Sequence, residues 1–167
     1  MDLHVHTCLS PCADLSMVPR TIVERARQTG LDAVGICDHN SAANVQAVHE
    51  TGAEAGIGVI AGMEVTTAEE IHRLGGLAIA SHADRQTFSI LSQLGFIPIE
   101  LDLDGVELSH HAGPEEHYQL HSLPVVRSSD AHFPEEIGST FTTFFVEEAT
   151  VAEIRMALAA REGRKIL

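Results

Sequence analysis

Short apolar stretches of strand length alternate with longer helix-like stretches along the whole chain. Helical patterns occupy residues 19–28, 42–55, 87–94 and 114–120, and a closing helix begins at Thr150. Strand-like stretches occupy residues 3–7, 33–37, 58–65, 77–81, 105–108, 125–128 and 141–146. This alternation is typical of βα units around a parallel sheet. We therefore expect an α/β fold, and periodicity alone does not choose between a βα barrel and a doubly wound layer.

Length and charge limit the class of protein. The chain has 167 residues, which fits a single domain over residues 1–167. Its formal net charge is −14, so we expect no duplex nucleic acid as a partner, because such a surface repels polyanions. No apolar run approaches the length of a membrane span. Three cysteines, with no signal-like segment before them, favour a reducing, cytoplasmic location.

Histidine is the most informative residue type, because its 11 copies exceed the 10 lysines and arginines together. His4 and His6 alternate on the first predicted strand, so their side chains share one face. Further metal-binding residue types follow the ends of later strands, where parallel α/β folds place their sites. Burying them together would be costly without a cation. The sequence therefore predicts a metal centre from His4, His6, Asp38, His39, Glu64, His82, Asp130 and His132.

The order of these motifs resembles the PHP family, the polymerase and histidinol phosphatase domain, over nearly the whole chain. The resemblance implies a distorted, seven-stranded, TIM-like βα barrel with two or three divalent metal ions, which are zinc, manganese or iron. It implies phosphoester hydrolysis with Glu64, Asp130 and His132 as the catalytic residues. Glu64 is expected to bridge two metals and Asp38 to orient His39. The implied metal ligands are His4, His6, His39, Glu64, His82, Asp130 and His132.

Only residues 65–81 separate Glu64 from His82, where family members carry a further strand with a histidine ligand and a helix. We therefore expect a compact barrel that lacks one strand-helix unit after Glu64. His72, in a predicted helix at 67–74, is either the displaced ligand or an ordinary helix residue. Asp14, in the first loop, is a further candidate ligand, although aspartate is also common in turns.

Other histidines and the thiols are assigned more weakly. His110 and His111 either face the site or lie in an exposed loop. His49, His117 and His121 fall within helical stretches and are expected on the surface. Cys8, Cys12 and Cys37 are expected to be buried or loop thiols without a role in the chemistry.

The predicted reaction is hydrolysis of a small phosphomonoester or short nucleotide by a metal-activated hydroxide, with an exonuclease role on short single strands as the fallback. Arg85, three residues after His82, is the candidate phosphate ligand, because a guanidinium can grip phosphate with two bonds. An amidohydrolase-like enzyme is less favoured, because the only lysine, Lys165, lies next to the C-terminus and could not bridge metals. A metal-stabilised regulatory domain without turnover is the other alternative.

Overall fold

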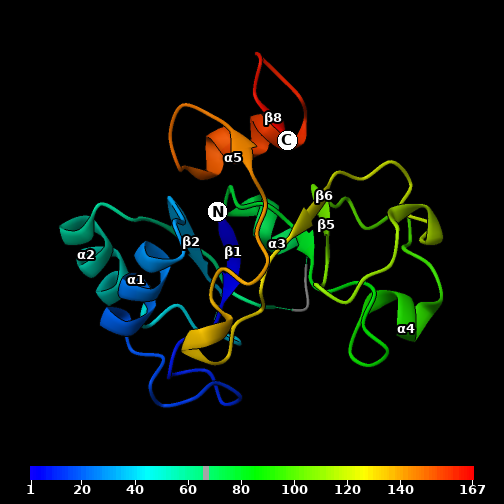
Figure 1. Cartoon of the computed structure of the whole chain (residues 1–167). Helices are drawn as coiled ribbons and strands as arrows, with labels where there is room; N and C mark the ends of the chain where they lie inside the picture. Colours follow the sequence, from blue (N-terminus) through cyan, green and yellow to red (C-terminus); the bar gives the residue numbers. More distant parts are fainter. Residues whose placement is uncertain (66–67) are drawn as a thin grey trace.

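The first half of the chain forms a parallel three-stranded sheet (Figure 1). The computed structural model describes residues 1–65 and 68–167. Strands β1 (Asp2–Val5), β2 (Ala33–Ile36) and β3 (Gly58–Ala61) pair in that order. Helices α1 (Pro19–Gln28) and α2 (Val45–Ala55) connect them and pack against one another on the same side of the sheet. These are the βα units that the sequence predicts.

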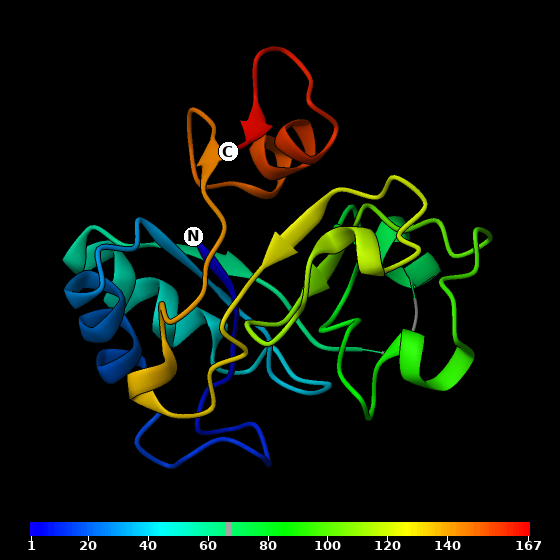
Figure 2. The same cartoon turned by 45° about the vertical axis from the view of Figure 1, so that its right-hand side comes forward.

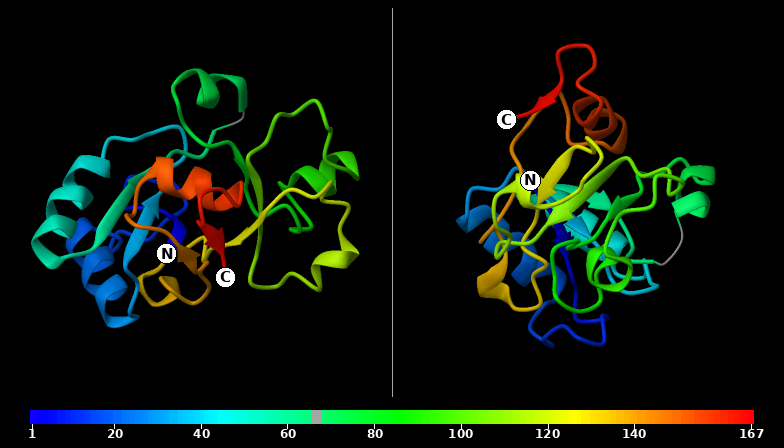
Figure 3. Two further views of the ribbon diagram at one scale, coloured as in Figure 1. Left: turned by 90° about the horizontal axis from the view of Figure 1, so that it is seen from above. Right: turned by 90° about the vertical axis from the view of Figure 1, so that its right-hand side faces the viewer.

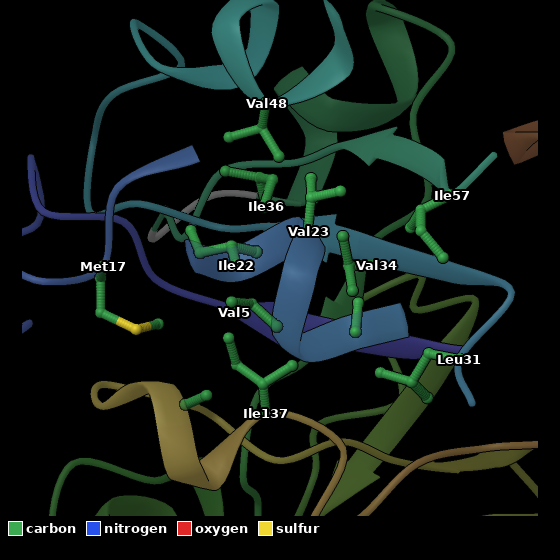
Figure 4. Close-up of a cluster of buried hydrophobic side chains, with 12 residues drawn as sticks. Val5, Met17, Ile22, Val23, Leu31, Val34, Ile36, Val48, Ile57 and Ile137 are labelled. Atoms are coloured by element: carbon green, nitrogen blue, oxygen red, sulfur yellow. The ribbon is translucent and has the colours of Figure 1, made fainter. Parts of the chain in front are cut away.

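The main hydrophobic core lies between this sheet and its two helices (Figure 4). Ile22 and Val23 of α1 and Val48 of α2 point toward Val34 and Ile36 of β2, and all five are buried. Helix α1 begins with Pro19, whose missing N–H costs nothing at that position. Helix α2 ends at Gly56, which adopts a left-handed conformation with φ 72° that suits glycine.

The second half forms another parallel sheet, from β4 (Ile79–Ala80), β5 (Gly105–Leu108) and β6 (Val125–Arg127). In the sequence, helix α3 (Ala68–Arg73) precedes β4 and helix α4 (Ile90–Leu94) precedes β5. Two short 3₁₀ helices, Glu115–His117 and Pro134–Glu136, come before and after β6 in the sequence. A second, smaller core surrounds the buried side chains of Val106 and Leu108. Seen from above, the segment with α4 lies on the opposite side of the molecule from α1 and α2 (Figure 3).

The two parallel sheets meet next to the N-terminal strand. The backbone of Ala131, just after β6, pairs in parallel with Val5 of β1. The amide of His6 donates to the Ala131 carbonyl at 3.0 Å, and the Ala131 amide donates to the His4 carbonyl at 3.2 Å. This junction brings the ends of β1 and β6 together, which is where the predicted ligands lie.

The C-terminal part forms a separate antiparallel ribbon from β7 (Phe144–Phe145) and β8 (Lys165–Ile166). Helix α5 (Val151–Leu158) lies between them in the sequence, and the Thr150 side chain caps it by accepting a hydrogen bond from the Glu153 amide. Two views show this part standing above the two sheets (Figures 1 and 2).

The α/β fold with parallel-rich sheets is confirmed, whereas the seven-stranded barrel is not. Within residues 1–65 and 68–167, β3 and β4 do not pair with each other, so no closed barrel forms. A largely apolar cavity of about 460 Å³ lies between the segments that carry these two strands. The predicted helix at 67–74 begins at a residue outside the described part, and α3 covers 68–73. Across the described helices, none has the length and hydropathy needed to cross a membrane.

Candidate metal centre

The carboxylate of Glu64 lies among four imidazole rings that come from the ends of three different strands. Glu64 follows β3, and its backbone pairs in parallel with His39, which follows β2. His4 and His6 come from the end of β1, and His82 follows β4. Glu64 Oε2 is 3.6 Å from His4 Nε2, 3.6 Å from His6 Nε2 and 3.2 Å from His39 Nδ1, and Oε1 is 3.3 Å from His82 Nε2.

Asp130 supplies a second carboxylate on the other side of the same histidines. Its Oδ1 is 3.1 Å from His6 Nε2 and 3.5 Å from His4 Nε2. The guanidinium of Arg85 forms an ion pair with Oδ2, so the structure brings this predicted phosphate ligand to the site. His132 Nδ1 is 3.7 Å from Oδ1. His4 and His6 therefore lie between two carboxylates, an arrangement in which neighbouring cations can share ligands.

Three histidines have Nδ1 held by a partner, which leaves Nε2 available to a metal ion. His4 Nδ1 lies 3.2 and 3.1 Å from the two carboxylate oxygens of Glu107. His6 Nδ1 is 3.0 Å from Ser10 Oγ, and His132 Nδ1 is 2.7 Å from the Asp130 carbonyl. A carbonyl or carboxylate partner requires Nδ1 to carry the proton, which leaves the Nε2 lone pair free. Metal-binding histidines are oriented in this way.

The cluster fits divalent cations. His4 Nε2 and Glu64 Oε2 are buried and have no hydrogen-bond partner, which is costly for groups that are not metal-bound. Two sets of three ligand atoms lie within 4.8 Å of one another, namely His4, His6 and Glu64, and His6, Asp130 and His132. Imidazole and carboxylate donors suit zinc, manganese or iron.

Charge stabilises the carboxylates of the cluster in their ionised form. Burial alone would raise the pKa of Glu64, but the nearby imidazoles of His4 and His82 outweigh this effect and hold the pKa below its usual value. Burial likewise opposes ionisation of Asp130, whose pKa is lowered mainly by His6. Burial would lower the pKa of His4, yet Glu107 and Glu64 raise it well above the usual value. The pocket therefore favours positive charge, supplied by protons or by cations.

Two ligand candidates have an uncommon backbone conformation. His82 has φ 31° and Asp130 has φ 51°, both in the left-handed region that costs non-glycine residues about 1 to 3 kcal/mol. The His82 amide donates to Glu107 Oε1 at 3.1 Å, which helps to hold this turn. Such conformations turn a side chain sharply at the end of a strand, and here both side chains face the cluster.

Three residues that the sequence assigns to the metal centre, Asp14, His72 and Asp38, have their main contacts elsewhere. The Asp14 carboxylate is exposed and accepts hydrogen bonds from the amide and hydroxyl of Ser16, at 2.8 and 2.6 Å. His72 Nε2 is 2.7 Å from Asp104 Oδ2. Asp38, expected to orient His39, accepts hydrogen bonds from the Thr7 amide and hydroxyl, each at 2.7 Å, and so positions the end of β1. Neither Asp14 nor His72 joins a potential metal-binding group among the described residues.

Sequence reasoning missed Glu107, Ser10 and Cys12. Glu107 is a buried acid in an otherwise apolar strand. An acidic residue in such a strand indicates a buried partner, so the sequence contained evidence for its role. Ser10 and Cys12 lie in a loop, where the sequence gives no orientation. A cavity of about 530 Å³ opens beside the cluster, and its lining includes Cys12, Arg85, His110, Asp130, His132 and Phe133. His110 therefore borders the site.

Comparison with known families decides the classification. The model of the PHP domain matches residues 2–144. The chain belongs to the PHP family. Within this PHP protein, the matched region contains every member of the Glu64 and Asp130 cluster, and it supports a metal-dependent hydrolase. An uncharacterized protein of Methanocaldococcus jannaschii is 30% identical over 138 residues, which cover 64% of this chain and 79% of that protein.

Other relatives carry functional names. A 5′-3′ exoribonuclease of Haemophilus influenzae is 34% identical over 77 residues, which cover 44% of this chain and 27% of that protein. The lesion-specific endonuclease Q of Pyrococcus furiosus has a similar structure, with a TM-score of 0.78 and 21% identity. The similarity covers 99% of this chain and 56% of the endonuclease, so the chain spans little more than half of its length. A protein from Bifidobacterium adolescentis described as a metal-dependent phosphoesterase has a TM-score of 0.63 at 18% identity, over 84% of this chain and 91% of that protein.

The expectation of a small substrate and no duplex nucleic acid is wrong. An endonuclease Q with the same fold, at a TM-score of 0.66 and 21% identity, is known in complex with a 27-mer duplex that carries an abasic lesion at the active site. That similarity covers 99% of this chain and 57% of the endonuclease. The charge argument failed because net charge describes the long-range field of the molecule, whereas local contacts in the site decide whether a phosphate backbone can bind.

Proposed function

We propose that this PHP protein is a metal-dependent nuclease that hydrolyses a phosphodiester bond in DNA. The main support for the proposal is the cavity beside the cluster. Arg85 and His110 line it together with Asp130 and His132, which are candidate metal ligands. The structural similarity to endonuclease Q, which acts on damaged DNA, supports the choice of substrate.

Each part of the cluster has a proposed task. His4, His6, His39, His82 and His132, with Glu64 and Asp130, would hold two or three divalent ions, with Glu64 shared between two of them. The bound ions would polarise a phosphoryl oxygen and lower the pKa of a bound water. Arg85 would bind a non-bridging phosphate oxygen with its guanidinium, whose side chain is 44% exposed and so within reach of a substrate.

Binding must be local, because the net charge of −14 offers DNA no general attraction. Among the described residues that line the cavity beside the cluster, Arg85 is the single lysine or arginine, so metal ions and Arg85 would supply most of the positive charge. Moving a nucleotide out of an intact duplex costs the energy of unstacking and unpairing its base. This cost is lower where the base is already unpaired or missing. We therefore expect a duplex with an abasic site to be cleaved faster than an intact duplex.

A direct assay tests the proposal. Metal-loaded protein is incubated with a labelled duplex that contains one abasic site, the matched intact duplex, single-stranded RNA and an aryl phosphate. We expect metal-dependent cleavage of the abasic duplex, with a loss of about 100-fold or more in Glu64→Gln. Glu54→Gln, an exposed change on α2, is the control and should keep full activity. Turnover of the aryl phosphate with no cleavage of nucleic acid would refute the nuclease.

The relationship to the Haemophilus influenzae exoribonuclease supports a second candidate, 5′-3′ degradation of RNA. The same assay separates the two functions. Release of nucleotides from the 5′ end of RNA, with the abasic duplex left intact, would favour the exoribonuclease.

A further inference from the structure

A cysteine in the first loop contacts the predicted ligand His132. The Sγ atom of Cys12 lies 3.1 Å from His132 Nε2. The other ring nitrogen of His132 is engaged by the Asp130 carbonyl at 2.7 Å, so the Nε2 lone pair is directed toward the sulfur. A thiol and an imidazole lone pair that face each other in this way either share a proton or bind the same cation.

Cys12 also belongs to a third group of potential metal-binding atoms, which shares His6 with the two groups described above. Cys12, His6 and His39 offer ligand atoms that all lie within 4.8 Å of one another. A tetrahedral zinc ion with Zn–S of about 2.3 Å and Zn–N of about 2.0 Å separates a sulfur and a nitrogen ligand by about 3.5 Å. The contact between Cys12 and His132 is close to this separation and needs only a small side-chain movement.

The loop that carries Cys12 is fixed to the strand end that carries His132. The Asp14 amide donates to the His132 carbonyl at 2.9 Å, which ties the two backbones together next to the sulfur. The Cys8 amide donates to the Met17 carbonyl at 2.9 Å, and the Ala13 amide donates to the Ser10 carbonyl at 3.1 Å. The loop thus holds the thiol beside the cluster.

We propose that Cys12 is a thiolate ligand of the metal centre, on the side of His132, His6 and His39. The inference rests on the proposed metal centre and adds to it a donor other than imidazole and carboxylate. A thiolate favours zinc or ferrous iron over manganese and magnesium, which prefer oxygen donors. With Cys12 as a ligand, the centre should prefer zinc or ferrous iron more strongly than a centre with imidazole and carboxylate ligands alone.

Cobalt(II) provides a test that does not depend on activity. Metal-free protein is loaded with cobalt(II), and its absorption spectrum is recorded for the unchanged chain, for Cys12→Ser and for Cys8→Ser. We expect a near-ultraviolet thiolate-to-cobalt charge-transfer band in the unchanged chain and in Cys8→Ser, and its loss in Cys12→Ser. Cys8 is the matched control, because it lies in the same loop and its sulfur faces Asn44 Nδ2 at 3.9 Å.

Each result decides the matter. Cobalt that binds without this band, or a band that survives in Cys12→Ser, would overturn the thiolate ligand while leaving the metal centre in place. Failure to bind any cobalt would overturn the metal centre as well. Zinc affinity adds a second measurement: we expect Cys12→Ser to bind zinc at least about 10-fold more weakly, with little change for manganese. Because Cys12 is exposed, its replacement by serine should leave the melting temperature of the metal-free protein unchanged.

Discussion

The Glu107 carboxylate orients the His4 imidazole through Nδ1, which lies 3.2 and 3.1 Å from the two carboxylate oxygens. Both residues are almost fully buried, and Glu107 Oε1 also accepts a hydrogen bond from the His82 amide at 3.1 Å. One carboxylate from β5 therefore positions two ligand candidates, of which His4 lies in β1 and His82 follows β4. This contact links the two parallel sheets at the metal centre.

Replacing Glu107 should weaken metal binding although Glu107 does not face the cluster. In Glu107→Gln, the negative charge that stabilises the His4 N–H is lost, and whichever position the amide nitrogen takes, it would face an N–H of His4. We expect zinc affinity to fall by about 10- to 100-fold. Isothermal titration of the metal-free protein measures this loss, and Glu116→Gln, an exposed change, is the control. Unchanged affinity in Glu107→Gln would show that His4 needs no partner.

Replacing Arg85 should reduce catalysis through weaker phosphate binding. In Arg85→Ala the guanidinium beside Asp130 is lost. We expect kcat/KM on the abasic duplex to fall by about 10-fold or more, and the slope of log KM against log salt to decrease by about 1. Arg20→Ala, an exposed change on α1, serves as the matched control. A salt dependence that is identical in Arg85→Ala and the unchanged chain would remove Arg85 from the phosphate site.

Most of the ligand cluster could be predicted from the sequence, because its members follow strand ends. His4 and His6 share a face by the period of two residues, and Glu64, His82 and Asp130 each follow the carboxyl end of a parallel strand. Loop geometry could not be predicted in this way. Asp14 and Cys12 are two residues apart in one loop, yet the Asp14 carboxylate binds Ser16 locally, while Cys12 faces His132.

Closure of the barrel could not be predicted from the sequence either. Apolar composition indicates that residues 58–65 and 77–81 suit strands, but it does not show which strands pair. In the described residues β3 pairs only with β2, and β4 only with β5. Pairing across the gap would require the short segment between them to bring both edges together, and α3 lies in that segment instead.

The three cysteines should react with alkylating reagents at different rates. Burial raises the pKa of the Cys37 thiol to about 11, and Glu107 and Glu64 add to this effect while His4 opposes it. At pH 8 the Cys37 thiol is therefore almost entirely protonated and unreactive. We expect iodoacetamide to label Cys12 first and Cys37 only after unfolding, as measured by peptide mass spectrometry in buffer and in urea. Fast labelling of Cys37 in the folded protein at pH 8 would contradict the burial of its thiol.

Gly35 should be the most sensitive glycine of the central sheet, because β1 and β2 approach each other there too closely for a side chain. A Cβ atom at this position would lie 2.8 Å from Leu3 Cα and closer still to the Leu3 carbonyl oxygen. Both are backbone atoms of β1, so the strand itself would have to move. In Gly35→Ala we expect a loss of about 1 to 3 kcal/mol of unfolding free energy, the usual cost of overpacking.

The displacement should also reach the metal centre, since Leu3 directly precedes His4. We expect Gly35→Ala to lower the melting temperature by roughly 2 to 12 °C and to weaken zinc binding at the same time. Gly113→Ala is the control, because its Cβ would lie 3.2 Å from the exposed side chain of His117, which can move aside. Scanning calorimetry and zinc titration measure the two effects. If Gly35→Ala lost stability but kept full zinc affinity, the position of His4 would not depend on the close contact between β1 and β2.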